Sequence, residues 1–356
     1  MNFEKLIEDA AKTGASDIFL IPEKPVAYKL RREIRELPGS LLSQNDAAGL
    51  LDYIFAAAGR SQESFRKTGD DDFAVNLNCG RFRVSALKQM GKPSAVIRPV
   101  SAAVPDYRAM GIPEAVLDTA KYQKGLVLVT GPAGSGKSTT LACIMDRFNH
   151  QSQKHIITIE DPVEFIYEND KCLFTQRELG TDTESYAGGL RACLRQAPDV
   201  IMVGEMRDYD TIKTALTAAE TGHLVFSTLH TLGISSTVNR IIDIFPPDQQ
   251  QQIRVQLASQ LQTAITQELI RTVDGELVPV FEVVQLTAAM KNMIRENKTH
   301  QLDSSLGIYS SDGSMNLDHQ LTELYKAGKI TLEAAMNAAI RPDLLKKRIE
   351  DGFEIG

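Results

Sequence analysis

The stretch Gly131-Pro132-Ala133-Gly134-Ser135-Gly136-Lys137-Ser138-Thr139 decides the fold of the second half of this chain. It matches the pattern G-x-x-x-x-G-K-[ST], in which glycines let backbone N–H groups point at a phosphate. An apolar run at 126–129 precedes it, as a buried strand would, and residues compatible with a helix follow at 139–148. A chance glycine-rich turn would lack this context. The stretch therefore predicts a phosphate site built from a strand, a loop and a helix N-terminus.

We expect all nine residues of this loop to bind ATP. The side chain of Lys137 is long enough to reach the β- and γ-phosphates, and the hydroxyl of Ser138 is a ligand for Mg²⁺.

Composition restricts the class of protein. A chain of 356 residues is long enough for two domains, and its 43% hydrophobic content is ordinary for a soluble protein. The formal net charge of −7 gives no general attraction to nucleic acid. We see no signal peptide and no apolar run of 18 residues, so we expect a cytoplasmic protein that reaches a membrane only through a partner.

The four cysteines, at 79, 143, 172 and 193, are scattered and form no C-x-x-C pair. This spacing argues against a zinc ribbon and against a disulfide framework.

The chain divides into two parts. Residues 1–100 combine helical periodicity near the start with alternating strands at 73–77, 82–84 and 95–97, which predicts a small α+β domain. Prolines and a glycine crowd residues 101–113, as in a linker, and the second domain occupies 114–356. Four apolar strands are predicted there, at 126–130, 156–159, 200–203 and 224–226. Because they are apolar on both faces, we expect an α/β domain with a mainly parallel sheet.

Each of these strands ends in reactive residues, and ligands of such sheets bind beyond the carboxyl ends of the strands. Glu205 follows the strand 200–203 and suits a Mg²⁺ ligand, although a solvent-facing carboxylate would look the same. Glu160, Asp161 and Glu164 are candidates for orienting water, with helix-start acids as the alternative. His223 and His230 flank the strand 224–226. We expect them near the γ-phosphate, with two structural histidines as the alternative.

The chain resembles the PilT-type ATPases, the retraction motors of type IV pili within the secretion ATPase superfamily. Four segments carry the resemblance in order and spacing: the phosphate loop, an Asp box at 157–165, a Walker B box at 199–208 and a His box at 221–231. The segment 240–246 also matches. A retraction signature, AIRNLIRE, is present approximately at 289–296, where Met290, Lys291 and Met293 depart from it.

The resemblance implies a homohexamer with PAS-like N-terminal and RecA-like C-terminal domains, peripheral at the inner membrane and acting on a pilus platform protein. It makes Glu164 catalytic, places Glu205 near Mg²⁺ and gives both histidines a role. It also implies arginines that complete a neighbour's site, for which Arg81 and Arg83, on one face of a strand, are candidates, as is Arg98.

Other functions remain open at this point. A pilus extension or secretion ATPase usually carries an extra N-terminal domain and a four-cysteine metal site, neither of which we recognise here. An accessory retraction paralogue would share every motif. A nucleic-acid translocase is disfavoured by the acidic charge, and a non-hydrolysing scaffold by the presence of Glu164 and Glu205.

Overall fold

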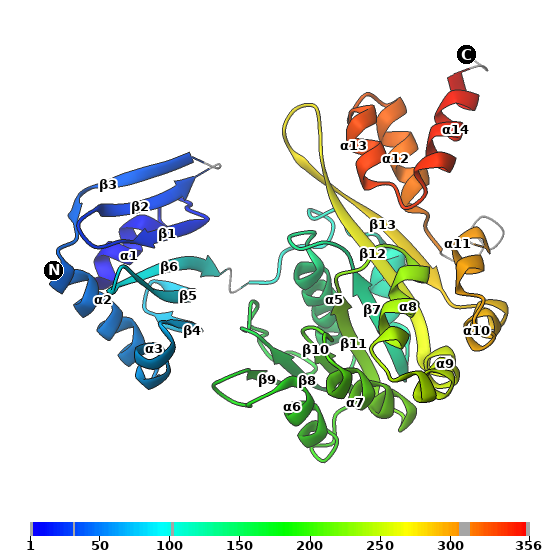
Figure 1. Ribbon diagram of the computed structural model, residues 1–356, viewed down its shortest axis with the longest axis horizontal. Helices are drawn as coiled ribbons and strands as arrows, with labels where there is room; N and C mark the ends of the chain where they lie inside the picture. Colours follow the sequence, from blue (N-terminus) through cyan, green and yellow to red (C-terminus); the bar gives the residue numbers. More distant parts are fainter. Residues whose placement is uncertain (1–2, 31–32, 101–102, 306–313, 354–356) are drawn as a thin grey trace. The chain divides into compact units, whose positions relative to one another are not determined.

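The computed structural model describes residues 3–30, 33–100, 103–305 and 314–353 and divides them into two compact units (Figure 1). The first unit comprises residues up to 103 together with two short segments, 161–166 and 178–184, and the second comprises the rest. The division at 103–104 falls within the stretch 101–113. Residues 101–102 of that stretch lie outside the described residues, and 103–113 contain no helix or strand.

The first unit is built on an antiparallel sheet of six strands in the order β3-β2-β1-β6-β5-β4. The strands are β1 (Asp17–Leu20), β2 (Pro25–Leu30), β3 (Glu33–Leu41), β4 (Asp70–Leu77), β5 (Gly80–Gln89) and β6 (Lys92–Val100), and the helices are α1 (Phe3–Ala11), α2 (Gln44–Ala57) and α3 (Glu63–Thr68). The predicted strands at 73–77, 82–84 and 95–97 are therefore confirmed, within β4, β5 and β6.

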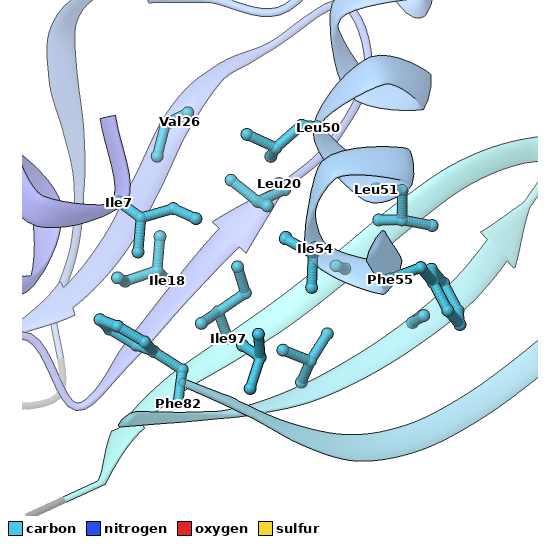
Figure 2. Close-up of a cluster of buried hydrophobic side chains, with 14 of the residues drawn as sticks. Ile7, Ile18, Leu20, Val26, Leu50, Leu51, Ile54, Phe55, Phe82 and Ile97 are labelled. Carbon is cyan, nitrogen blue, oxygen red and sulfur yellow. The ribbon is translucent and has the colours of Figure 1, made fainter. Parts of the chain in front are cut away.

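The core of this unit lies between the sheet and its helices (Figure 2). Alternate residues of the strands, such as Phe82 on β5 and Ile97 on β6, belong to one hydrophobic cluster with Ile54 and Phe55 of α2. Helix α2 begins at a capping box, in which Ser43 and Asp46 each bond the other's backbone N–H.

The second unit contains a sheet of seven strands in the order β13-β12-β7-β11-β10-β8-β9. The strands are β7 (Gly125–Thr130), β8 (His155–Glu160), β9 (Leu173–Glu178, whose last residue groups with the first unit), β10 (Val200–Val203), β11 (Leu224–Leu229), β12 (Leu261–Arg271) and β13 (Leu277–Gln285). Strands β12, β7, β11, β10 and β8 run parallel, and β13 pairs antiparallel with β12. The predicted α/β class with a mainly parallel sheet is confirmed.

Helices pack on this sheet: α5 contacts β7, α6 contacts β8 and β10, and α7 contacts β7 and β11. The helical segments of the second unit are α4 (Glu114–Leu117), η1 (Asp118–Lys121), α5 (Lys137–Gln151), α6 (Tyr186–Cys193), α7 (Tyr209–Glu220), α8 (Ile234–Asp243), α9 (Pro247–Gln260), α10 (Ala288–Arg295), η2 (Thr299–Gln301), α11 (Leu302–Ser305), α12 (Leu317–Lys326), α13 (Leu332–Ala338) and α14 (Pro342–Phe353). Within the described ranges, no helix has both the length and the apolar character needed to cross a membrane.

The last three helices, α12, α13 and α14, lie together beside the β12–β13 pair (Figure 1). They share a separate hydrophobic cluster in which Leu317, Leu321 and Leu345 pack with Ile270 of β12 and Val280 of β13. The C-terminal helices thus pack against the edge of the sheet formed by β12 and β13.

Candidate nucleotide site

The phosphate loop connects the end of β7 to the first residue of α5, as the motif predicts. Gly131 has φ 140° and Gly136 has φ 89°, both in the left-handed region that favours glycine. A Cβ at Gly131 would overlap the carbonyl oxygen of Gln267, and one at Gly136 would lie 2.9 Å from the Gln267 amide nitrogen. The loop therefore needs glycine at both positions, for its backbone angles and because β12 presses against it.

The groups inside the loop suit a bound phosphate. The hydroxyl of Ser135 is buried and has no hydrogen-bond partner among the described residues. The side chain of Lys137 is also buried, and its ammonium donates to the carbonyls of Gly131 and Pro132 at 2.9 and 2.8 Å. The N–H groups of the first turn of α5 have no acceptor within the helix. An anionic oxygen would satisfy these donors together, so the residues present fit a nucleotide phosphate.

The remaining residues of the motif line the open side of this loop. Pro132, Ala133, Gly134 and Ser138 are exposed, and Thr139 is half-buried.

Three charged or titratable side chains meet where β7, β10 and β11 end. The ammonium of Lys137 lies 3.5 Å from Nδ1 of His230, and Nε2 of His230 lies 3.6 Å from a carboxylate oxygen of Glu205. Since an ammonium only donates, Nδ1 is the acceptor and the neutral ring carries its proton on Nε2, toward Glu205. His230 therefore links the loop lysine to the Walker B carboxylate.

The surroundings of His230 favour its neutral form. Burial comes first among the causes that lower its pKa below 6.5, followed by the nearby charges of Lys137 and Arg207, whereas Glu205 opposes the shift. A neutral imidazole at this place can hold or pass a proton without adding a second cation beside Lys137.

Ser138 and Glu205 supply the oxygen atoms that Mg²⁺ prefers. In the described part of the chain no group of three or more His, Cys, Asp or Glu side chains is arranged to hold a metal ion. Glu205 also pairs with the Nε of exposed Arg207 at 2.6 Å, so metal binding would compete with this ion pair.

His223 is placed at the other end of β11, before its first residue, whereas His230 follows its last. Its Nδ1 lies 3.1 Å from the carbonyl of Ala218 and 3.2 Å from the hydroxyl of Thr221. The structure brings only His230 to the phosphate loop, and the contacts of His223 join the end of α7 to the start of β11.

The acidic residues at the end of β8 and directly after it do not start a helix, because the next element is the strand β9. The helix-start explanation for them is therefore wrong. Glu160 is buried and accepts a hydrogen bond from Thr158 at 2.6 Å. Asp161 and Glu164 belong to the segment 161–166 of the first unit, where Glu164 is half-buried.

The three candidate arginines have different surroundings. Within the first unit, Arg81 donates to the carboxylate of Glu178 at 2.6 Å and to the carbonyl of Val163 at 3.2 Å. Arg98 donates to Asp17 at 2.7 and 3.0 Å. The side chain of Arg83, on β5, forms no hydrogen bond or ion pair with any residue that the structure describes. Of these three arginines, Arg83 is thus the one whose guanidinium has no hydrogen-bond or ion-pair partner within the described chain.

No sequence motif points to Gln267, which lies against the loop on β12. A polar residue in a mixed stretch has no motif of its own, and only the spatial pairing of β12 with β7 reveals it.

Comparison with known proteins shows the family to which the chain belongs. The family model described as "Type II/IV secretion system protein" matches residues 2–310. The chain belongs to this family. A protein of Pseudomonas aeruginosa named as the type IV pilus retraction ATPase PilT is 39% identical over 344 residues, which cover 96% of this chain and 99% of that protein. The type IV pilus ATPase PilU of the same organism is 34% identical over 356 residues, covering 99% of this chain and 93% of that protein.

Among solved structures, the crystal structure of the pilus retraction motor PilT with bound ADP has a TM-score of 0.90, with 40% identity, 98% of this chain covered and 99% of that one. These matches confirm the resemblance to PilT-type ATPases and the predicted architecture. They also confirm that this family member is an ATPase of the secretion and pilus type.

Proposed function

We propose that this chain is a hexameric motor ATPase that drives type IV pilus retraction, and with it twitching motility, through an inner-membrane platform protein. The observation that carries the proposal is the match to a protein named as the retraction ATPase, which extends over 96% of this chain and 99% of that protein. The match to the retraction motor with ADP bound supports the same nucleotide here. The protein would work in the cytoplasm, peripheral at the inner membrane.

In this proposal the loop 131–139 holds ATP, with Lys137 moving from the loop carbonyls to the β- and γ-phosphates. Mg²⁺, held by Ser138 and Glu205 together with phosphate oxygens, would neutralise charge on the phosphates. Glu164 orients or deprotonates the attacking water, and His230 holds a proton beside the γ-phosphate. Of the arginines, Arg83 is the best candidate for reaching a neighbour's nucleotide, because Arg81 and Arg98 already have acidic partners.

The domain boundaries proposed from the sequence, 1–100, 101–113 and 114–356, fit this mechanism. The linker would serve as a hinge on which nucleotide binding moves one domain.

A role as accessory retraction ATPase is the second candidate. It is favoured by the match to PilU, which covers 99% of this chain. Extension and secretion ATPases remain less favoured because the four cysteines are scattered and do not form a metal-binding pattern. A DNA translocase or a scaffold without turnover is tested by measuring hydrolysis with and without DNA, and we expect hydrolysis that DNA does not stimulate.

The direction of the motor is tested by deleting the gene and counting surface pili. Loss of a retraction motor leaves excess pili and abolishes twitching, and a Lys137→Ala copy should not restore motility. Cells without pili would contradict the proposal and indicate extension. Excess pili with only weakened twitching would favour the accessory role.

Assembly is tested with purified protein. If sites form between subunits, hydrolysis rises more than linearly with protein concentration. Mixing inactive Lys137→Ala and Arg83→Ala subunits then restores part of the activity, because an intact loop can meet an intact arginine. A fully active monomer in ultracentrifugation would contradict a shared site.

A further inference from the structure

We propose that Gln267 is a positioning residue that holds the phosphate loop in its binding shape. This inference rests on the proposed role of the loop in binding ATP. Gln267 lies on β12 next to Thr266, which is in register with Thr130, the last residue of β7. It therefore lies level with Gly131, where the loop leaves the sheet.

Gln267 contacts the loop at two places and the helix that follows it at a third. Its backbone carbonyl occupies the space that a Cβ of Gly131 would need, at the start of the loop. Its amide nitrogen lies beneath Gly136, at the end of the loop. Its amide oxygen accepts a hydrogen bond of 2.6 Å from the hydroxyl of Thr140, in the first turn of α5. One residue thus joins the beginning of the loop, its end and the helix that follows.

The contacts of Gln267 are buried, and they therefore restrict the conformation of the loop strongly. Gln267 is 3% exposed and Thr140 is fully buried. A buried hydrogen bond with no competing water is costly to leave unmade, so the amide and the hydroxyl hold each other in place. Because Thr140 is two residues after Ser138, this bond also fixes the helix turn that presents the proposed Mg²⁺ ligand.

Loss of the contacts should act on binding. Without the support of Gln267 the loop samples conformations in which its N–H groups no longer point at one phosphate. The apparent affinity for nucleotide then falls in proportion to the fraction of molecules in the binding-competent conformation. Among the described residues the side chain of Gln267 forms no hydrogen bond with His230, which is proposed to act on the γ-phosphate, so turnover of bound ATP should change little.

The experiment compares Gln267→Leu, which keeps the size but removes the amide, with Thr263→Val as a matched control. Thr263 lies on the same strand, is also buried and shares a partly buried hydrogen bond with Tyr122 at 2.9 Å, away from the loop. We expect Gln267→Leu to raise the KM for ATP and the Kd for ADP roughly five- to tenfold, the factor of about one net hydrogen bond, with kcat within about twofold. Thr263→Val should lower thermal stability similarly and leave the KM unchanged.

Two further variants test the hydrogen bond itself. Thr140→Ser keeps the hydroxyl and should bind ADP like the parent protein, whereas Thr140→Val should resemble Gln267→Leu. The double variant Thr140→Val/Gln267→Leu should bind no more weakly than Gln267→Leu alone, because both remove the same bond.

The outcomes separate this inference from the proposal on which it rests. If Lys137→Ala binds ADP normally, the loop is not the nucleotide site, and both fail. If Lys137→Ala loses binding while Gln267→Leu keeps the parent KM and Kd, only the positioning role is overturned. Equal losses of affinity in Gln267→Leu and Thr263→Val would likewise overturn it, because the effect would then be one of general stability.

Discussion

The ammonium nitrogen of Lys137 lies 3.5 Å from Nδ1 of His230, although the two residues are 93 positions apart in the chain. Parallel pairing of β7 with β11 creates this contact, since Thr130 and Leu229 are in register at the ends of the two strands. The phosphate loop therefore begins at the level of the sheet where the strand of the His box ends, which is where His230 lies. His230 thus lies between Lys137 and Glu205, and in the proposed mechanism it would respond to what Lys137 binds.

Replacing His230 by Asn should separate binding from hydrolysis. Asn is polar but too short to bridge Lys137 and Glu205, so the proton path is lost while the loop stays intact. We expect ATP hydrolysis to fall about a hundredfold, the scale of a positioned acid or base, with ADP affinity within a fewfold of the parent. Turnover assays and calorimetric titration with ADP measure the two quantities. An unchanged turnover rate would show that His230 has no part in the chemistry.

The lowered pKa of His230 predicts a pH dependence of stability. The folded protein binds the proton at a pH below 6.5, whereas the unfolded chain binds it near the ordinary value of 6.5. As the pH falls through about 6.5, the unfolded state takes up more protons and the folded state loses stability. The free energy of unfolding of His230→Asn, compared with the parent at pH 8 and pH 5.5, should therefore show a relative gain for the variant at pH 5.5. An equal difference at both values would contradict the shift.

Two glycines of the loop should differ in their tolerance of alanine. Gly131 and Gly134 both have positive φ, at 140° and 77°, but a Cβ at Gly134 would have nothing within 4 Å. Gly134→Ala thus carries only backbone strain of about 1–2 kcal/mol. Gly131→Ala adds a clash with the carbonyl of Gln267 and should abolish ADP binding. Thermal unfolding and ADP titration test the pair, and equal ADP affinity in both variants would contradict the packing of β12 against the loop.

The sequence was sufficient to predict the strands β7, β8, β10 and β11, because they are short apolar runs buried on both faces. It did not reveal β12 as part of the same sheet. Thr263, Thr266 and Gln267 are polar but buried there, since each hydrogen-bonds a residue of another element. Their polarity breaks the apolar pattern from which a buried strand is recognised.

The candidate site was predictable wherever a motif places a residue at a strand end, as for Lys137, Glu205 and His230. Pairing across the fold was not predictable. Arg81 and Glu178 are 97 positions apart, and alternation on β5 gave only the face on which Arg81 lies, not its acidic partner. The same alternation could not distinguish Arg81 from Arg83.

Arg81 and Arg83 should therefore behave differently when replaced by alanine. The side chains of Arg81 and Glu178 are only 12% and 9% exposed, so Arg81→Ala leaves a buried carboxylate unpaired. We expect a loss of about 3–5 kcal/mol in the stability of the first unit. Arg83→Ala should change stability by less than about 0.5 kcal/mol but lower ATP turnover. Denaturant unfolding and turnover assays distinguish them, and full turnover in a well-folded Arg83→Ala protein would exclude Arg83 from the nucleotide site.

Glu282 on β13 gives the last prediction. It is fully buried, neither carboxylate oxygen has a hydrogen-bond partner among the described residues, and burial raises its pKa from 4.5 to about 8, with Arg341 opposing and Asp303 and Asp318 adding to the shift. Below about pH 8 the folded protein therefore keeps this carboxyl protonated. Its contribution to stability is complete below pH 4.5 and is lost as the pH rises through about 8, because the unfolded chain ionises first. Glu282→Gln, which cannot ionise, should flatten the pH dependence of the unfolding free energy, and at pH 8 its unfolding free energy should exceed that of the parent by roughly 2–4 kcal/mol.

Exposed Glu276, directly before β13, provides the control, since Glu276→Gln should change neither the pH dependence nor the unfolding free energy at pH 8. A parent protein whose stability is flat between pH 5 and pH 8.5 would show that Glu282 is ionised in the fold, and that its charge is compensated by Arg341.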